Sequence, residues 1–144
     1  MSSEAITSAR NQFSGAITAL TQGMVNTEVI LDIGGGSSIT AVITNASAKA
    51  LDLKVGSQVI ALIKATWVIV SVDNELRTSA RNSFKGKVKT AKPGAVNAEI
   101  VIGLPGGQSL VSIVTNESLN SLGLKEGLEV TALVKSSNVI IGVK

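Results

Sequence analysis

The sequence predicts an all-β protein made of two OB-like five-stranded barrels, each with one short helix. Three observations favour this fold class. Two halves of the chain have related sequences, runs within each half alternate polar and apolar residues, and glycine-rich turns separate the runs. Aromatic residues make up only 2% of the chain, so the cores must be built from Val, Ile, Leu and Ala.

The two halves are a tandem duplication with an offset of 71 residues. Residues 7–72 align with 78–143 without a gap, and 28 of the 66 aligned pairs are identical. We therefore predict a first repeat at 7–72, a connector at 73–77 and a second repeat at 78–144. A barrel of this size would bury only about 60% of its unfolded surface, so fusion and oligomerisation are expected ways to bury more.

The strands of each repeat follow from a period of two in the apolar residues. After an opening run at 8–20, the first repeat alternates over 25–33, which is typical of a strand with one buried face. The side chains predicted to face inward are Val25, Thr27, Val29, Leu31 and Ile33, and in the second copy Val96, Ala98, Ile100, Ile102 and Leu104. Residues 34–37 and 105–108 predict hairpin turns, followed by returning strands at 38–43 and 110–114.

A short helix is predicted after Thr44 and after Thr115. Each threonine is followed by an asparagine and, three positions on, by a serine, a pattern typical of helix N-termini. Gly56 and Gly127 are predicted to stop these helices. Two further β-rich runs, 57–64 and 67–72 in the first copy, are expected to close each repeat. About five strands and one helix fit an OB-like barrel.

Composition argues against an enzyme. The chain has no Cys and no His, which excludes thiolate nucleophiles, Ser-His-Asp systems, histidine zinc sites and the usual general base near neutral pH. No apolar run approaches the roughly 20 residues needed to span a bilayer, and no export signal is recognisable. A cytoplasmic protein without a membrane partner is expected, and its net charge of +3 permits an anionic partner.

The polar residues shared by both copies form a set of donors with few acids, which suits an anion. At a helix N-terminus, unpaired N–H groups and hydroxyls such as those of Thr44 and Ser47 can bind one. The alternative is that Thr44 only caps the helix. Lys64, at the end of an apolar strand, can supply compact positive charge to an oxyanion, or it is simply exposed there. Arg10 either joins such a site or fixes a strand edge.

Four blocks recur at constant spacing in both copies: Ser-Ala-Arg-Asn, Gly-x-Val-Asn-x-Glu, Thr-Asn-x-Ser and Ala-Leu-(Ile/Val)-Lys. In this combination the chain resembles the molbindin family, whose repeating unit is the Mop domain, over 7–143. The resemblance implies a cytoplasmic molybdate-binding protein that also accepts tungstate, assembles as a homotrimer and uses no metal cation or organic cofactor. Family members that bind DNA or ATP carry further segments without a counterpart here, so a store or buffer of molybdate is expected.

The resemblance also implies the anion sites, which in the family lie between Mop units. One side is formed by the Ser-Ala-Arg segment and the strand-end lysine with its following residue: Ser8, Ala9, Arg10, Lys64 and Ala65, and in the second copy Ser79, Ala80, Arg81, Lys135 and Ser136. The other side is the threonine–serine turn, formed by Thr44 and Ser47, or by Thr115 and Ser118. A second class of site near the trimer axis would use Gly23, Val25, Asn26, Gly94, Val96 and Asn97.

The two copies differ at two positions of this predicted site. Ser136 replaces Ala65, and either residue can present a backbone N–H group. Asn138 replaces Trp67, so the copies are expected to differ in packing or affinity.

The main alternative is single-stranded nucleic-acid binding, which OB-like barrels often perform. Lys85, Lys87 and Lys89 alternate along one predicted strand, but the first copy has Ser14, Ala16 and Thr18 there. Such binders also need aromatic stacking platforms, so we interpret the lysines as a solvated face and expect no nucleic-acid partner.

An enzyme would need the shared glutamates, Glu28 and Glu99, as acid or base beside the strand-end lysines. Both lie on the polar side of an alternating strand, where a surface role is favoured. Residues 34–36 form no phosphate loop, because the Lys-Ser/Thr that follows one is missing. A purely structural role is the last alternative.

Overall fold

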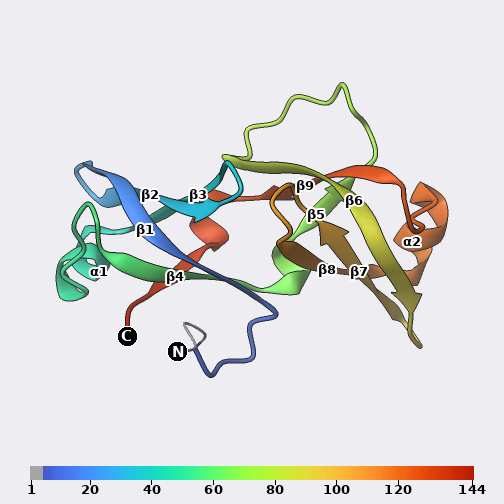
Figure 1. The fold of residues 1–144 in the computed structure, drawn as a ribbon, viewed down its shortest axis with the longest axis horizontal. Helices are drawn as coiled ribbons and strands as arrows, with labels where there is room; N and C mark the ends of the chain where they lie inside the picture. The colour runs from blue at the N-terminus through green and yellow to red at the C-terminus, as the bar shows by residue number, and fades with distance from the viewer. Residues whose placement is uncertain (1–4) are drawn as a thin grey trace. The chain divides into compact units, whose positions relative to one another are not determined.

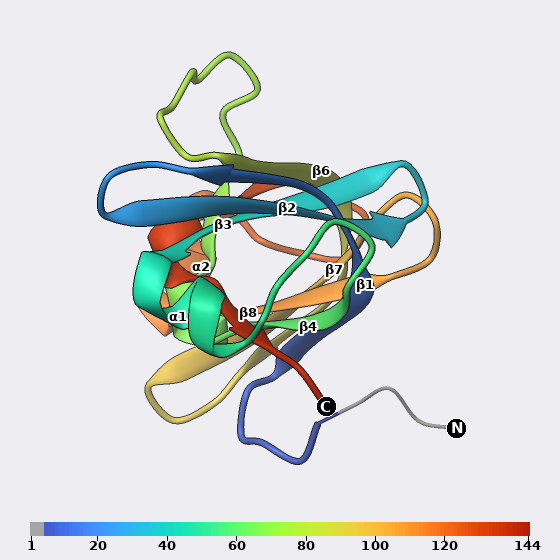
Figure 2. The ribbon, with the colours of Figure 1, turned by 90° about the vertical axis from the view of Figure 1, so that its left-hand side faces the viewer.

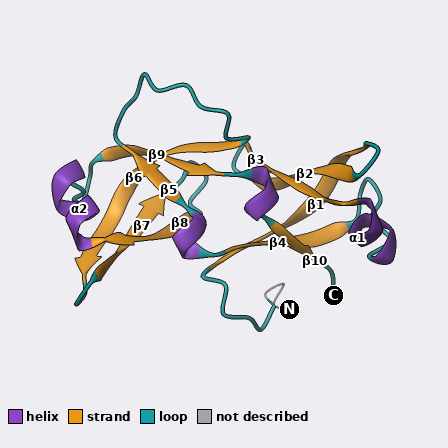
Figure 3. Ribbon diagram, turned by 180° about the vertical axis from the view of Figure 1, so that it is seen from behind, coloured by secondary structure: helices purple, strands orange, loops and turns teal. Residues whose placement is uncertain are grey.

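The computed structural model describes residues 5–144 and divides into two compact units. Unit 1 contains the chain up to Ile63 together with Lys135–Lys144, and unit 2 contains Lys64–Val134. Each unit holds one five-stranded antiparallel sheet (Figure 1). The helical segments of both units are short (Figure 3). The prediction of an all-β, OB-like fold is confirmed.

Unit 1 is built around one long strand, β1, which pairs with β4 along its first half and with β2 along its second. A register shift between Ile17 and Ala19 marks a bulge, and such a bulge bends a strand. Figure 2 shows β1 curving from β2 towards β4. The sheet order is β10-β4-β1-β2-β3. The elements are β1 (Asn11–Gln22), β2 (Asn26–Gly34), β3 (Ser37–Thr44), α1 (Asn45–Ala50), β4 (Gln58–Ile63), the 3-10 helix η2 (Ser136–Asn138) and β10 (Ile140–Gly142).

Unit 2 repeats this arrangement with the order β5-β9-β6-β7-β8. Its long strand β6 has the equivalent register shift, between Val88 and Thr90. The elements are the 3-10 helix η1 (Ala65–Trp67), β5 (Ile69–Ser71), β6 (Asn82–Pro93), β7 (Asn97–Gly103), β8 (Ser109–Thr115), α2 (Asn116–Leu122) and β9 (Glu129–Val134).

The closing strands are exchanged between the repeats. β10, from the second repeat, pairs with β4 of the first, and β5, from the first repeat, pairs with β9 of the second. The expectation that each repeat is closed by its own last runs is therefore wrong, whereas the opening strands β1 and β6 stay with their own repeats. In unit 2 the exchanged segment is fixed to β8 by a buried hydrogen bond of 2.7 Å from Ser112 Oγ to the Val68 carbonyl.

The predicted alternation places the core correctly from the second residue of β2 and β7 onward. The inward residues Thr27, Val29, Leu31 and Ile33 are buried, as are their counterparts in β7 and at Leu104. Val25 and Val96 are wrong predictions, because each is 72% exposed. Both valines lie in the preceding turn, where the strand alternation has not begun; the Gly23 N–H closes that turn by donating to the Asn26 carbonyl at 2.8 Å.

The helices end earlier than the sequence indicated. The C-cap residues are Leu51 for α1 and Gly123 for α2, so Gly56 and Gly127 do not stop them. Those two glycines lie in the following turn, with φ of +94° and +89°, a region that favours glycine.

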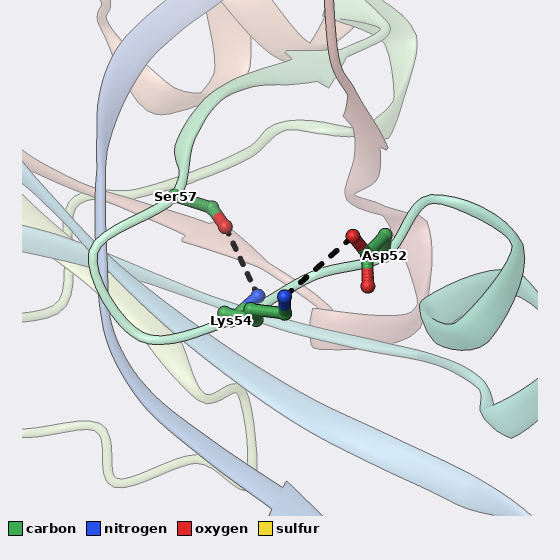
Figure 4. A network of polar contacts seen from close by, with 3 residues as sticks. All are labelled: Asp52, Lys54 and Ser57. Atoms are coloured by element: carbon green, nitrogen blue, oxygen red, sulfur yellow. Dashed lines mark hydrogen bonds and ion pairs between the residues drawn. The ribbon is translucent and has the colours of Figure 1, made fainter.

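Asp52 takes the left-handed conformation that Gly123 takes in the second copy. Its φ is 52° and that of Gly123 is 64°. The Asp52 carboxylate lies 3.7 Å from Lys54 Nζ, and the Lys54 N–H donates to Ser57 Oγ at 3.0 Å (Figure 4). Because both charged side chains are largely exposed, the ion pair contributes little stability. The hydrogen bond to Ser57 lies in the loop that leads into β4.

Candidate functional site

The threonine–serine turns have the same geometry in both copies. Thr44 Oγ1 accepts from the Ser47 N–H at 3.0 Å and donates to Ser47 Oγ at 2.9 Å, and Thr115 and Ser118 show the same two distances. Thr44 therefore caps α1, as the alternative interpretation proposed. Because the threonine proton is used inside the cap, the serine hydroxyl is the group that can donate outward.

The Gly23–Asn26 turn is tied to the same place by Asn45, the asparagine of the Thr-Asn-x-Ser block, which the predicted site did not include. Asn45 Nδ2 donates to the Gly23 carbonyl at 3.0 Å, and the Asn45 N–H donates to the Val25 carbonyl at 2.9 Å. Asn26 is the cross-strand partner of Thr44. The structure thus brings residues from both predicted classes of site together. The recurrence of this asparagine in both copies was visible in the sequence, but its contacts with the Gly23–Asn26 turn were not predicted.

The second copy repeats this anchor with one hydrogen bond missing. Asn116 Nδ2 donates to the Gly94 carbonyl at 2.9 Å, but its buried Oδ1 has no partner. In the first copy Thr27 Oγ1 donates to Asn45 Oδ1 at 2.6 Å. The residue equivalent to Thr27 is Ala98, which has no hydroxyl.

Replacing Ala98 with threonine is expected to stabilise unit 2 by about 1 kcal/mol, because the new hydroxyl satisfies a buried acceptor. Thermal unfolding measures the change. Thr27→Val is the matched control and is expected to destabilise unit 1 by about 1–2 kcal/mol, since it leaves Asn45 Oδ1 unpaired. A lower melting temperature for Ala98→Thr would contradict the prediction.

The Ser-Ala-Arg segments precede the long strands. Ser8, Arg10, Ser79 and Arg81 are exposed, and Ala9 and Ala80 are half-buried. The Ala9 N–H donates to Thr7 Oγ1 at 3.1 Å, and the Ala80 N–H donates to Thr78 Oγ1 at 3.2 Å. Ala9 and Ala80 are among the anion-site residues that the resemblance implies, and their N–H groups have internal partners that an anion would have to displace.

The strand-end lysines are exposed and have identical backbone geometry. Lys64 follows β4 and Lys135 follows β9, each with φ of −67° and ψ of 134°. Ala65 is buried, and Ser136 is half-buried. Lys64 Nζ lies 5.9 Å from the centre of the Trp67 ring.

The first copy's Ser-Ala-Arg segment and its threonine–serine turn lie at opposite ends of β1. Asn11, directly after Arg10, pairs with Ile63 at one end, and Gln22 pairs with Thr27 at the other, beside the Asn26–Thr44 pair. A strand of 12 residues has a path of roughly 40 Å. Within unit 1, Ser8–Arg10 and the threonine–serine turn therefore flank opposite ends of the same long strand.

A cavity of about 490 Å³ in unit 1 borders the Thr44 cap. Its polar lining consists of Asn26, Thr44, Ser47 and Ser137, and the rest is mainly aliphatic. Ser137 comes from the exchanged C-terminal segment, directly after Lys135 and Ser136. The cavity thus places that segment next to the first repeat's threonine–serine turn.

The lysines of β6 do not form one regular stripe. Lys85, Lys87 and Lys89 are all exposed, but the register shift falls at Lys89, whose Nζ donates to Ser109 Oγ at 3.1 Å. Lys87 pairs across the sheet with Glu129.

Within residues 5–144, no cluster of acidic side chains suitable for a metal ion is found. The same residues contain no helix that is long and apolar enough to cross a bilayer.

Comparisons with known proteins match this architecture. The TOBE domain model matches residues 7–70 and 78–141. The chain is 42% identical to the molybdenum transport protein ModE of Azotobacter vinelandii, over 95% of the chain and 51% of ModE. It is 41% identical to the molybdenum-pterin-binding protein MopA of Rhodobacter capsulatus, over 94% of the chain and 51% of MopA. The chain therefore spans about half the length of these curated relatives.

A solved structure covers nearly the whole chain. The cytoplasmic molybdate-binding protein ModG, crystallised with molybdate bound, superposes with a TM-score of 0.93 at 47% identity, covering 97% of this chain and all of that one. The chain belongs to the TOBE-domain family, as a molbindin-type protein with tandem Mop domains. The prediction of a binding protein rather than an enzyme is confirmed by this membership.

Proposed function

We propose that this chain binds molybdate, and tungstate as well, as a cytoplasmic store or buffer. The observation that carries the proposal is its likeness over 97% of its length to ModG with molybdate bound. The twice-repeated set of hydroxyl, amide and cationic donors supports it, because a tetrahedral dianion needs many donors and few acids. Glu28 and Glu99, on strands β2 and β7, are the few acids that the repeats share.

The anion sites lie between Mop units of a homotrimer. The separation of Ser8–Arg10 from the threonine–serine turn supports this arrangement, because within unit 1 these two segments flank opposite ends of β1. We assign one side to Ser8, Ala9, Arg10, Lys64 and Ala65 with their second-copy equivalents, and the other side to the threonine–serine turns. The second class of site uses the Gly23–Asn26 turn and its counterpart in the second copy.

Selectivity follows from the size of the enclosure. Molybdate and sulfate share charge and tetrahedral shape, but molybdate is the larger ion. A rigid ring of donors spaced for the larger ion leaves the contacts to sulfate too long for good hydrogen bonds.

Calorimetric titration of the purified protein tests this proposal. Molybdate and tungstate are expected to release or absorb measurable heat, and sulfate and phosphate far less. Mass measurement of the same sample is expected to give a trimer. Equal responses to all four anions would refute the selectivity, and a strict monomer would refute sites between subunits.

A further inference from the structure

The two strand-end lysines differ in one neighbour. Lys64 Nζ lies 5.9 Å from the centre of the Trp67 ring, whereas Lys135 has Asn138 at the equivalent position. The backbones are otherwise the same, because the N–H of Trp67 and that of Asn138 each donate to the carbonyl of the preceding lysine at 2.9 Å. The repeats therefore contain a natural comparison of the same lysine with and without an aromatic ring.

The ring is placed beside the lysine by the 3-10 turn itself. Lys64 is the N-cap of this turn and Trp67 is its last residue, and the hydrogen bond from the Trp67 N–H to the Lys64 carbonyl keeps the two residues close together. Ala65, inside this turn, is 4% exposed and holds the turn against the core. Trp67 is half-buried, so its packing restrains the ring while a face remains available to the ammonium group.

We infer that Trp67 is a positioning residue for Lys64 and that it makes the Lys64 site bind the anion more tightly than the Lys135 site. This inference rests on the proposed function. A ring face attracts an ammonium group without neutralising its charge, so Lys64 keeps its full attraction for a dianion. A carboxylate neighbour would cancel that charge.

The gain comes from ordering Lys64 before the anion arrives. A lysine has a flexible four-carbon side chain, and immobilising it on binding costs conformational entropy. The Lys64 side chain is already partly ordered by Trp67 in the free protein, so it loses less conformational entropy on binding. The Lys135 side chain becomes ordered only when the anion binds. The expected difference in affinity between the two sites is about two- to fivefold, from the strength of exposed cation–π contacts.

Calorimetric titration with molybdate on matched variants of the full chain tests the role of the ring. Trp67→Asn makes the first copy like the second and is expected to weaken the tighter phase by about two- to fivefold. Asn138→Trp is expected to strengthen the weaker phase, and Trp67→Phe, which keeps a ring, to retain most of the affinity. An isotherm unchanged by Trp67→Asn would overturn the inference.

The single tryptophan of the chain gives a second readout that a purely structural role would not produce. Molybdate is expected to change its fluorescence in the wild-type protein and in Lys135→Ala, but not in Lys64→Ala. A signal that persists in Lys64→Ala overturns the inference. Absence of heat with wild-type protein overturns the proposed function as well, whereas heat that Trp67→Asn leaves unaltered overturns only the role of Trp67.

Discussion

A chain that ends at Val134 is expected to lose the fold of unit 1 while unit 2 stays folded. Unit 2 lies within Lys64–Val134, so the truncation leaves all of its strands in place. Unit 1 loses β10, which pairs with β4, and the buried side chains of Val139 and Ile141. Together these losses cost about 5 kcal/mol or more, comparable to the whole stability of a small domain. Hydrogen exchange is expected to show rapid exchange in β1–β4 and protection in β6–β9.

Point variants in the exchanged segment measure how much its buried side chains stabilise unit 1 when the strand itself is still present. Ile141→Ala removes a side chain that is 7% exposed and is expected to destabilise unit 1 by about 2–4 kcal/mol. Ile140→Ala, in the same strand, removes one that is 51% exposed and is expected to cost far less. Persistent protection of β1–β4 in the truncated chain would show that unit 1 does not need the exchanged strand.

The local elements could be predicted from the sequence because their causes are local. The period-two pattern gave the core face of β2 and β7, and the threonine–serine pairs gave both helix starts. The strand exchange could not be predicted, because residues 68–70 and 139–141 have nearly the same apolar pattern. Either segment would suit either sheet edge, and the partner is set by contacts distant in sequence.

In the candidate site, too, the sequence predicted local features but not the contacts between residues distant in sequence. Comparing the copies identified the polar residues that recur, but not which of them are neighbours. The pairing of Asn26 with Thr44 depends on the register of β2 and β3, and the separation of Arg10 from Thr44 depends on the path of β1. Neither the pairing nor the separation can be predicted from the spacing of the motifs. The unpaired Asn116 Oδ1 likewise needed the structure, since it results from a hydroxyl absent on a neighbouring strand.

The double variant Lys64→Ala with Lys135→Ala is expected to weaken molybdate binding strongly without unfolding the protein. Each proposed site loses a hydrogen bond from a charged donor, worth about 1.5–3 kcal/mol, which corresponds to about ten- to a hundredfold in affinity. Both lysines are exposed and follow the ends of their strands, so their truncation removes little packing. Calorimetric titration with molybdate measures the loss, and thermal unfolding is expected to be nearly unchanged.

The chain offers a control with the same change in net charge. Lys54 and Lys125 are the other lysine pair identical in the two repeats; both are exposed, and each follows its helix rather than a strand of the proposed site. Lys54→Ala with Lys125→Ala therefore lowers the net charge equally and is expected to leave affinity almost intact. If both double variants lost affinity equally, the protein's overall charge would explain the effect. If neither did, the strand-end lysines would not be anion ligands.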